Sequence, residues 1–312
     1  MSDPLPSPSV RRLDLGRVLT ALHRLARAES PPWLHTEVAR RMAERLLIIL
    51  AKPQALIDWW SFGGAGSEVL AQTYPQAQRV VVEPTPALRQ RSQALAAPGW
   101  WSRLRGTAST VTVVAADDVA PGSVQLVWAN MMLHGVADPT AVLARWHQAL
   151  AVDGFVMFSC LGPDTLRELR ELYHGMGWPP AMADFIDMHD LGDMLVHSGF
   201  ADPVMDQEIL SLSWPDARAL LAELRSLGGN ASPDRFPGLR TPRWRARLED
   251  ALDGLRGPDG RIHMRFEVAY GHAFKARPRA AQSTETTVSL DEMRALVRKR
   301  HGTDSADSSR LR

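Results

Sequence analysis

A glycine-rich segment and one carboxylate are the residues best suited to binding a nucleotide-like ligand. Gly63, Gly64 and Gly66 follow an apolar run, and Glu83 ends the next apolar run, 17 positions after Gly66. Glycines let a backbone approach a ligand closely, and an acid about 20 residues further on can accept hydrogen bonds from ribose hydroxyls. The spacing predicts a nucleotide site, with a plain loop and a solvated carboxylate as the alternative.

Apolar runs separated by helical patterns predict the sheet that must position these residues. Five continuous runs read as strands buried on both faces, at 56–60, 79–83, 111–115, 124–129 and 154–161. A helix fits between the last two, with Asp138 as its cap and Pro139 in its first turn. Alternating runs at 203–213 and 264–274 add antiparallel strands. The pattern predicts an α/β fold, a Rossmann-like, doubly wound, mostly parallel sheet of seven strands.

The segments outside the strands suggest three parts of the chain. Residues 1–52 form an N-terminal helical extension, with helices at 13–28 and 36–50. Residues 53–276 form the main domain, with a helical insertion at about 214–262 between the last two strands. Residues 277–312 form a polar tail that we expect to be largely disordered, apart from one small helix over 293–297. Further helices are expected at 165–173, 191–198, 216–227 and 241–255.

Composition excludes several classes of protein. A net charge of +1 gives no global field for nucleic acid. The single cysteine, Cys160, excludes an internal disulfide and a cysteine-based metal site, and no metal is expected. No apolar stretch approaches the roughly 18 residues of a membrane span. The simplest expected compartment is a bacterial-type cytoplasm.

The glycine segment resembles the first motif of class I S-adenosylmethionine-dependent methyltransferases, usually Asp-x-Gly-x-Gly-x-Gly. With Gly66 as the last glycine, the first glycine position falls on Phe62 and the acidic position on Trp60, while Asp58 lies two residues early. The motif thus departs from the family pattern in two places. The resemblance implies S-adenosylmethionine as cofactor, held by Gly63, Gly64, Gly66 and Glu83.

Two later segments also resemble this family. Asp117 follows the third strand, where the family places a residue near the adenine. Asn130-Met131-Met132-Leu133-His134 resembles the family's Asn-x-x-Leu-Gln, so Asn130 and Met131 are expected beneath the methionine part of the cofactor. Gln125 replaces the usual aspartate of that strand. The alternatives are a capping role for Asp117, a turn role for Asn130, and a core or rim position for His134.

Longer segments at 161–170, 187–193, 199–206 and 266–273 resemble malonyl-acyl-carrier-protein O-methyltransferases of biotin synthesis. The resemblance covers roughly residues 13–276 and implies methylation of the free carboxylate of a malonyl thioester, with an acyl carrier protein as partner. Arg170, and second Arg167, would neutralise and position this carboxylate. The alternative is a solvated helix face on which both arginines pair with Glu168 and Glu171.

Two other functions remain open, because related mitochondrial complex I assembly proteins share these segments. One is a pseudo-methyltransferase that acts as a binding or assembly protein, suggested by Trp60, Phe62 and Gln125. The other is an enzyme that modifies a protein arginine. An arginine cluster in the insertion could steer an acidic carrier protein or form an ordinary surface helix: Arg235, Arg240, Arg243, Arg245 and Arg247.

Overall fold

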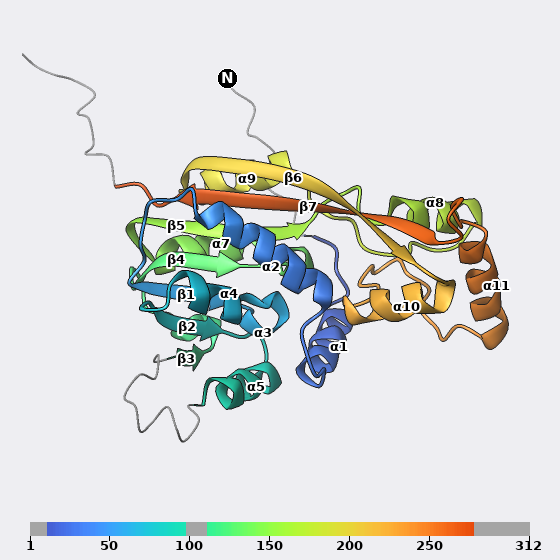
Figure 1. Ribbon diagram of the computed structural model, residues 1–312, viewed down its shortest axis with the longest axis horizontal. Helices are drawn as coiled ribbons and strands as arrows, with labels where there is room; N and C mark the ends of the chain where they lie inside the picture. Colours follow the sequence, from blue (N-terminus) through green and yellow to red (C-terminus); the bar gives the residue numbers. More distant parts are fainter. Residues whose placement is uncertain (1–10, 98–110, 278–312) are drawn as a thin grey trace, which may run out of the picture. The chain divides into compact units, whose positions relative to one another are not determined.

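The computed structural model describes residues 11–97 and 111–277 (Figure 1). The described residues up to Ala276 belong to one compact unit. The expectations for residues 1–10 and for the tail beyond residue 277, including the helix at 293–297, lie outside the described residues. The predicted division into three parts stays a prediction.

A seven-stranded sheet forms the centre of this unit. Its order is β3-β2-β1-β4-β5-β7-β6, and β7 is antiparallel to both of its neighbours while the other pairs are parallel. The strands are β1 (Ala55–Trp59), β2 (Gln78–Val82), β3 (Val111–Val114), β4 (Val124–Ala129), β5 (Leu150–Leu161), β6 (Ala201–Trp214) and β7 (Ile262–Phe274). The predicted fold class is confirmed. The strand boundaries differ from the predicted ones by one or two residues, except that β5 starts at Leu150, directly after the preceding helix, rather than at 154.

Helices cover both faces of the sheet. They are α1 (Leu15–Ala26), α2 (Trp33–Leu46), α3 (Ser61–Gly64), α4 (Gly66–Thr73), α5 (Pro86–Ala96), α7 (Pro139–Ala149), α8 (Arg167–Gly175), α9 (Met188–His197), α10 (Ala217–Ser226) and α11 (Pro242–Asp253). Asp138 accepts from the backbone N–H of Ala141 at 2.9 Å, so the predicted cap is confirmed. The second helix begins at Trp33, after Pro32, and ends at Leu46 rather than spanning 36–50.

Alternation along the central strands divides the core between the two faces. Leu126 and Trp128 of β4 pack in a cluster with Leu34, Val38 and Met42 of α2. The alternate residues Val127 and Ala129 pack in a second cluster with residues of α7 and α9. Successive side chains of a strand point to opposite faces, so the continuous apolar run of β4 supplies both cores.

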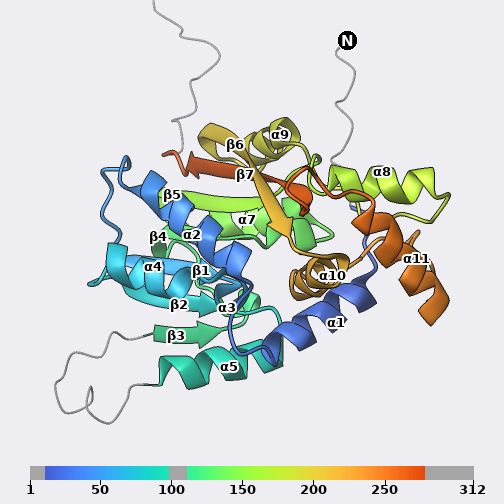
Figure 2. The same ribbon diagram turned by 45° about the vertical axis from the view of Figure 1, so that its right-hand side comes forward.

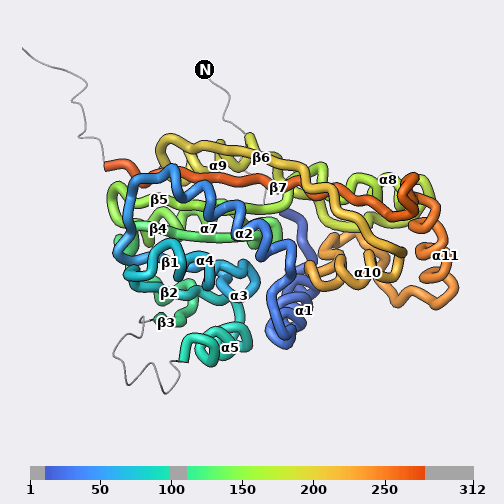
Figure 3. The backbone as a smooth tube through the Cα atoms, in the orientation of Figure 1, coloured from blue at the N-terminus to red at the C-terminus, as the bar shows by residue number. Residues whose placement is uncertain are grey.

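In the chain, helices α10 and α11 lie between β6 and β7, and the chain leaves β6 and enters β7 at the same end of the sheet (Figure 3). Helix α1 lies outside the sheet, alongside α5 and α10 (Figure 2). Its cap, Asp14, accepts from the backbone N–H of Arg17 at 3.1 Å. Arg24 of α1 donates from Nη1 to the carbonyl oxygen of Arg225 at 2.9 Å. Helix α1 is therefore fixed between the sheet and the insertion.

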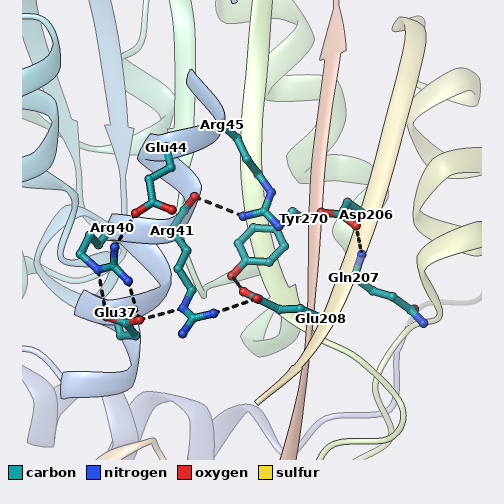
Figure 4. Close-up of polar contacts among 9 residues, drawn as sticks. All are labelled: Glu37, Arg40, Arg41, Glu44, Arg45, Asp206, Gln207, Glu208 and Tyr270. Atoms are coloured by element: carbon teal, nitrogen blue, oxygen red, sulfur yellow. Dashed lines mark hydrogen bonds and ion pairs between the residues drawn. The ribbon is translucent and has the colours of Figure 1, made fainter. Parts of the chain in front are cut away.

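Polar contacts join α2 to the last two strands (Figure 4). Arg41 pairs with Glu208 of β6 at 2.9 Å, and Arg45 pairs with Asp206 at 2.7 Å. The hydroxyl of Tyr270 on β7 donates to Glu208, and the guanidinium of Arg45 lies 3.8 Å from the centre of the Tyr270 ring. These contacts hold the C-terminal half of α2 against the antiparallel edge of the sheet.

Candidate functional site

The loop after β1 brings the glycine segment to the carboxyl edge of the sheet, where ligands bind in doubly wound folds. Trp60 has a φ of 57°, in the left-handed region that favours glycine, whereas Phe62 lies within the short helix α3. Ala65 of the same loop also lies in this region, with a φ of 54°, and the assignment of the first glycine position to Phe62 stays a prediction. The acid of this segment is Asp58 in β1, which is buried and accepts from Ser61 Oγ at 2.5 Å.

Two glycines of this loop are required by close packing. A Cβ atom on Gly64 would lie 2.9 Å from the carbonyl oxygen of Asn130. A Cβ atom on Gly66 would lie 2.6 Å from Trp128 Nε1 and 2.7 Å from Asp58 Oδ1. Any other residue would push the loop away from the ends of β1 and β4. Gly66 thus packs beneath the loop, and it lines none of the cavities described below.

Glu83 lies beneath the same loop and is only 1% exposed. Its Oε1 accepts from the backbone N–H of Phe62 at 2.8 Å and from Ser92 Oγ at 2.7 Å. Its Oε2 is buried and has no hydrogen-bond partner among the described residues. Burial raises the pKa of Glu83 to about 7, against the two hydrogen bonds, which lower it. The unpartnered oxygen is suited to a hydroxyl donor, and this feature fits a ribose.

Phe62, whose backbone N–H contacts this carboxylate, has a buried side chain. Its ring packs with Leu22 of α1 and Leu88 of α5, and the guanidinium of Arg91 lies 4.1 Å from the ring centre. A ribose would approach Glu83 beside this aromatic side chain.

Asp117, predicted near the adenine, has a side chain that is 80% exposed and pairs with Arg145 at 2.6 Å.

Asn130 lies at the end of β4 and is fully buried. Its Nδ2 donates to the carbonyl oxygens of His35 at 2.8 Å and Gly64 at 2.5 Å, and its Oδ1 accepts from Ser159 Oγ at 2.6 Å. Both donor hydrogens are thus engaged within the protein. Asn130 ties α2 and the glycine loop to the sheet, while the next residue, Met131, faces a cavity.

The first cavity lies over the glycine loop. It is lined by Trp60, Gly63 and Gly64 of the loop, by Met131, Met132 and His134 after β4, by His35 of α2, by Arg17, Leu22 and Leu25 of α1, and by residues 226–231 after α10. Three predicted cofactor residues, Gly63, Gly64 and Met131, therefore meet here. Cofactor residues Gly66, Glu83, Asp117 and Asn130 do not line this cavity.

Two histidines at the first cavity are neutral. His35 donates from Nδ1 to the carbonyl oxygen of Gly63 at 2.7 Å, and burial lowers its pKa to about 4. His134 accepts at Nδ1 from the backbone N–H of Leu161 at 3.4 Å, which places its proton on Nε2. Burial lowers the pKa of His134 to about 3. His134 is thus an uncharged hydrogen-bond donor.

The second cavity adjoins the first and shares Arg17, His134 and residues 227–231 with it. Its remaining walls are mostly apolar: Leu166, Leu169, Tyr173, Met182, Phe185, Leu221, Leu224 and Phe266. Arg17, Arg24 and Arg225 also line it, and among the described residues no acidic side chain lines either cavity. An apolar channel with cationic side chains suits an elongated acyl group that carries an anion.

Arg167 and Arg170 of α8 have other partners. Arg167 is about half exposed and pairs with Glu171 at 2.9 Å. Arg170 donates from Nη2 to the carbonyl oxygens of Pro163 and Thr165, the latter at 3.0 Å. Neither arginine lines the two cavities. Their predicted role with the acceptor carboxylate stays a prediction.

Gln125 lies at the opposite end of the sheet from the glycine loop. Its Oε1 accepts from the backbone N–H groups of Gln54 and Ala55 at 3.0 and 2.9 Å, at the start of β1. The interpretation of Gln125 as a weakened cofactor site was therefore wrong.

Cys160 is buried, and burial raises the pKa of its thiol to about 12.

Sequence reasoning missed Arg17 and His35. Arg17 belongs to no motif, and His35 falls in an ordinary amphipathic pattern, so only the fold places them at the cavities.

Within residues 11–97 and 111–277, no cluster of His, Cys, Asp and Glu could hold a metal ion. None of the helices in the described ranges is long and apolar enough to span a membrane.

Several curated proteins are similar to this chain. It is 39% identical over 250 residues to the malonyl-acyl-carrier-protein O-methyltransferase of Gallionella capsiferriformans, an alignment that covers 79% of this chain and 85% of that protein. It is 41% identical over 254 residues to the same-named protein of Laribacter hongkongensis, with coverage of 79% and 84%. No protein-family model matches the chain.

Solved structures share the fold. The YcgJ protein of Bacillus subtilis superposes with a TM-score of 0.51 at 10% identity, over 77% of this chain and 99% of that one. The cyclase SpnF superposes with a TM-score of 0.50 at 12% identity, over 86% and 98%. Since a cyclase shares the fold, the fold alone does not decide the reaction.

Proposed function

Because the chain belongs to the malonyl-acyl-carrier-protein O-methyltransferase family, we propose that it methylates the free carboxylate of a malonyl thioester on an acyl carrier protein, a step in biotin precursor synthesis. S-adenosylmethionine is the methyl donor. The observation that carries this proposal is the meeting of the two cavities, one over the glycine loop and one apolar, at Arg17 and His134.

The first cavity fits the cofactor by its exposed backbone and by walls that, Arg17 apart, are uncharged and mostly apolar. Gly63 and Gly64 present backbone without side chains, and Met131 supplies an apolar surface for the methionine portion. Glu83 lies beneath the loop and outside this cavity, and its unpartnered Oε2 would accept a ribose hydroxyl that reaches past the loop. When bound, S-adenosylmethionine supplies a methyl group on a positively charged sulfur.

The protein needs no general base for this reaction, because a carboxylate is already ionised at neutral pH. Its task is to hold the carboxylate oxygen in line with the methyl carbon. Bound S-adenosylmethionine would supply the methyl group to the positioned carboxylate oxygen and would leave as the uncharged thioether. His134 is neutral and donates from Nε2, so it can orient an acceptor oxygen without removing a proton.

The carrier protein approaches the mouth of the second cavity, beside Arg24 and Arg225. Within the predicted arginine cluster, Arg235 pairs with Asp14 and Arg245 with Glu249. Arg240 stacks between Phe236 and Trp244, at 3.8 and 4.2 Å from the ring centres. Arg243 and Arg247 of α11 are exposed and have no ion-pair partner among the described residues, so they are the cations left for an acidic partner. A cytoplasmic location accords with this substrate and stays a prediction.

One observation favours a second candidate, a protein that binds partners without methyl transfer. Trp60 occupies a left-handed position of the glycine loop, and the aromatic Phe62 stands where the backbone contacts Glu83. Both side chains reduce the space that glycines would leave beside the cofactor.

Two measurements separate these functions. The first is calorimetry with S-adenosylmethionine, for which we expect micromolar binding that Glu83→Ala weakens at least tenfold. The second is transfer of labelled methyl from S-adenosylmethionine to malonyl-carrier protein, with acetyl-carrier protein as the control without a free carboxylate. Absence of binding at millimolar cofactor, together with absence of transfer, would leave the partner-binding function as the better one.

A further inference from the structure

Arg17 occupies a unique position among the cations of the site. It lies in the first turn of α1, where the Asp14 cap fixes its backbone N–H. It lines the first cavity, the second cavity, and a third one formed with Tyr173, Pro180, Asn230, Arg235, Phe236, Arg240 and Trp244. Among the arginines that the structure describes, no other lines both the first and the second cavity. Arg17 is therefore the positive charge at their junction.

The guanidinium of Arg17 is available for a ligand. Among the described residues it forms no hydrogen bond and no ion pair, whereas Arg24 donates to the carbonyl of Arg225 and Arg235 pairs with Asp14 at 2.8 Å. No carboxylate lines the first or second cavity within the described ranges. An anion that enters either cavity would meet Arg17 without an acidic competitor.

We propose that Arg17 is the anchor for the free carboxylate of the acceptor, in place of the arginines of α8. This inference rests on the proposed function. The planar guanidinium offers two parallel N–H donors to a carboxylate. A carboxylate has about four lone-pair sites, so a lone pair stays available for the methyl carbon while the fork fixes the group. The thioester arm then extends along the apolar second cavity.

The position of Arg17 favours the acceptor over the cofactor as its ligand. Two of the three cavities that it lines lie away from the glycine loop, against α8, α10 and α11. Transfer takes place where the acceptor oxygen meets the methyl group, which is the junction of the first and second cavities. A cation at this junction selects acyl groups with a terminal carboxylate and discriminates against acetyl groups.

The same pairing accounts for release of the product. Methylation converts the carboxylate into an uncharged ester, which can accept hydrogen bonds but has no charge to pair with Arg17. A hydrogen bond to a charged group is worth roughly tenfold to a hundredfold in affinity. We therefore expect the methyl ester to bind about tenfold more weakly than the malonyl thioester, and this difference to vanish without the Arg17 charge.

The test compares Arg17→Gln, Arg17→Lys and Arg27→Gln. Arg27 is an exposed residue at the C-terminal end of α1 that lines none of the three cavities, so its substitution removes the same charge from the same segment. The readouts are the KM and kcat for malonyl-carrier protein, the Kd values of malonyl- and acetyl-carrier protein by calorimetry, and the Kd of S-adenosylmethionine. Melting temperatures show that the variants are folded.

We expect Arg17→Gln to raise the KM and Kd for malonyl-carrier protein at least tenfold, with unchanged Kd values for acetyl-carrier protein and for the cofactor. Arg17→Lys should recover part of the loss, and Arg27→Gln should match the wild type. Unchanged malonyl binding in Arg17→Gln overturns the anchor. Equal weakening of acetyl-carrier protein also overturns it, since Arg17 would then steer the carrier. A higher cofactor Kd with unchanged malonyl binding assigns Arg17 to the donor instead.

Failure of the proposed function gives a different result. A wild-type chain that transfers no methyl group to malonyl-carrier protein refutes the methyltransferase assignment. The binding comparison between malonyl- and acetyl-carrier protein still tests Arg17 in that case, because it requires no turnover. Equal affinity of the wild type for the two carrier proteins then refutes the anchor as well.

Discussion

The Nδ2 atom of Asn130 lies 2.8 Å from the carbonyl oxygen of His35, and this hydrogen bond joins β4 to the first turns of α2. The second hydrogen of the same amide is donated to the glycine loop at Gly64. One side chain therefore holds together two walls of the first cavity. Its contribution is to the shape of the site, and any direct contact with a cofactor would have to come from its neighbours.

Asn130→Asp should destabilise the fold. The change keeps the shape of the side chain but removes both donors, which leaves two buried carbonyl oxygens without a partner and adds a buried charge. A buried unsatisfied group costs about 1–3 kcal/mol, so we expect a loss of about 2 kcal/mol or more by urea unfolding. Gln90→Glu, an exposed amide-to-acid change on α5, is the control and should be nearly neutral. A nearly neutral Asn130→Asp would contradict the structural role.

Glu83→Gln should change how stability depends on pH. The folded pKa of Glu83 is about 7, above its ordinary value of 4.5, so the folded state holds the proton more tightly. Its contribution to stability is complete below pH 4.5 and is lost as the pH rises to about 7. The variant keeps an acceptor for the N–H of Phe62 and loses this dependence. We expect Glu83→Gln to gain roughly 3 kcal/mol relative to the wild type between pH 4.5 and pH 8.

The stability of Glu83→Gln must be compared with that of the wild type at each pH. Two histidines change the stability of both proteins with pH in the direction opposite to Glu83. His35 and His134 have folded pKa values of about 4 and 3, below their ordinary 6.5. Their contribution is complete above pH 6.5 and is lost as the pH falls. The histidines contribute equally to wild type and variant, so their effect cancels. A constant difference between the two proteins across this range would refute the raised pKa of Glu83.

His134→Gln tests how much of the loss of stability at acidic pH is due to His134. The change introduces the residue that the family motif has at this position and removes a histidine that must protonate when the chain unfolds. We expect stability to fall less between pH 7 and pH 5 than in the wild type, as measured by urea unfolding at both values. His23→Gln, on the exposed side of α1, should behave as the wild type. An equally steep fall in His134→Gln would show that His134 protonates as easily in the folded state.

Ala65→Gly should stabilise the loop, since Ala65 has a φ of 54° at the junction of α3 and α4. A non-glycine residue in the left-handed region costs about 1 kcal/mol or more, so glycine should raise the free energy of unfolding by about 0.5–1 kcal/mol. Ala71→Gly, an exposed position inside α4, is the matched control and should lose about 1 kcal/mol. The same sign of effect at both positions would contradict the strain at Ala65.

The sequence predicts the sheet well because each central strand is buried on both faces and therefore continuously apolar. Val127 and Trp128 illustrate this, since neighbouring residues of β4 enter different cores. Helices α4 and α5 lie between the first three strands, where the alternation of strands and helices predicts helices without giving their bounds. The boundary of α7 and β5 also shifted, because Leu150 passes from helix to strand without a turn.

The site is less accessible to sequence reasoning than the fold. Gly63, Gly64 and Met131 meet at one cavity, as the motifs imply. The free charge of Arg17 could not be predicted, because pairing is a property of the folded chain. Arg170 looks equally cationic in the sequence, yet its guanidinium is used by the carbonyls of its own turn.

The second cavity has walls from α1, α8, α10, residues 181–185 and the segment after α10, and within the described ranges the sheet contributes only Phe266 and Leu161. The elements proposed to bind the acceptor are thus largely separate from the strands that stabilise the fold. Substitutions in α1 or α10 can alter which acyl group is accepted while the packing of β1, β4 and β5 stays intact. In this architecture acceptor choice is open to change by mutation, whereas the loop beside Asn130 is constrained by the core itself.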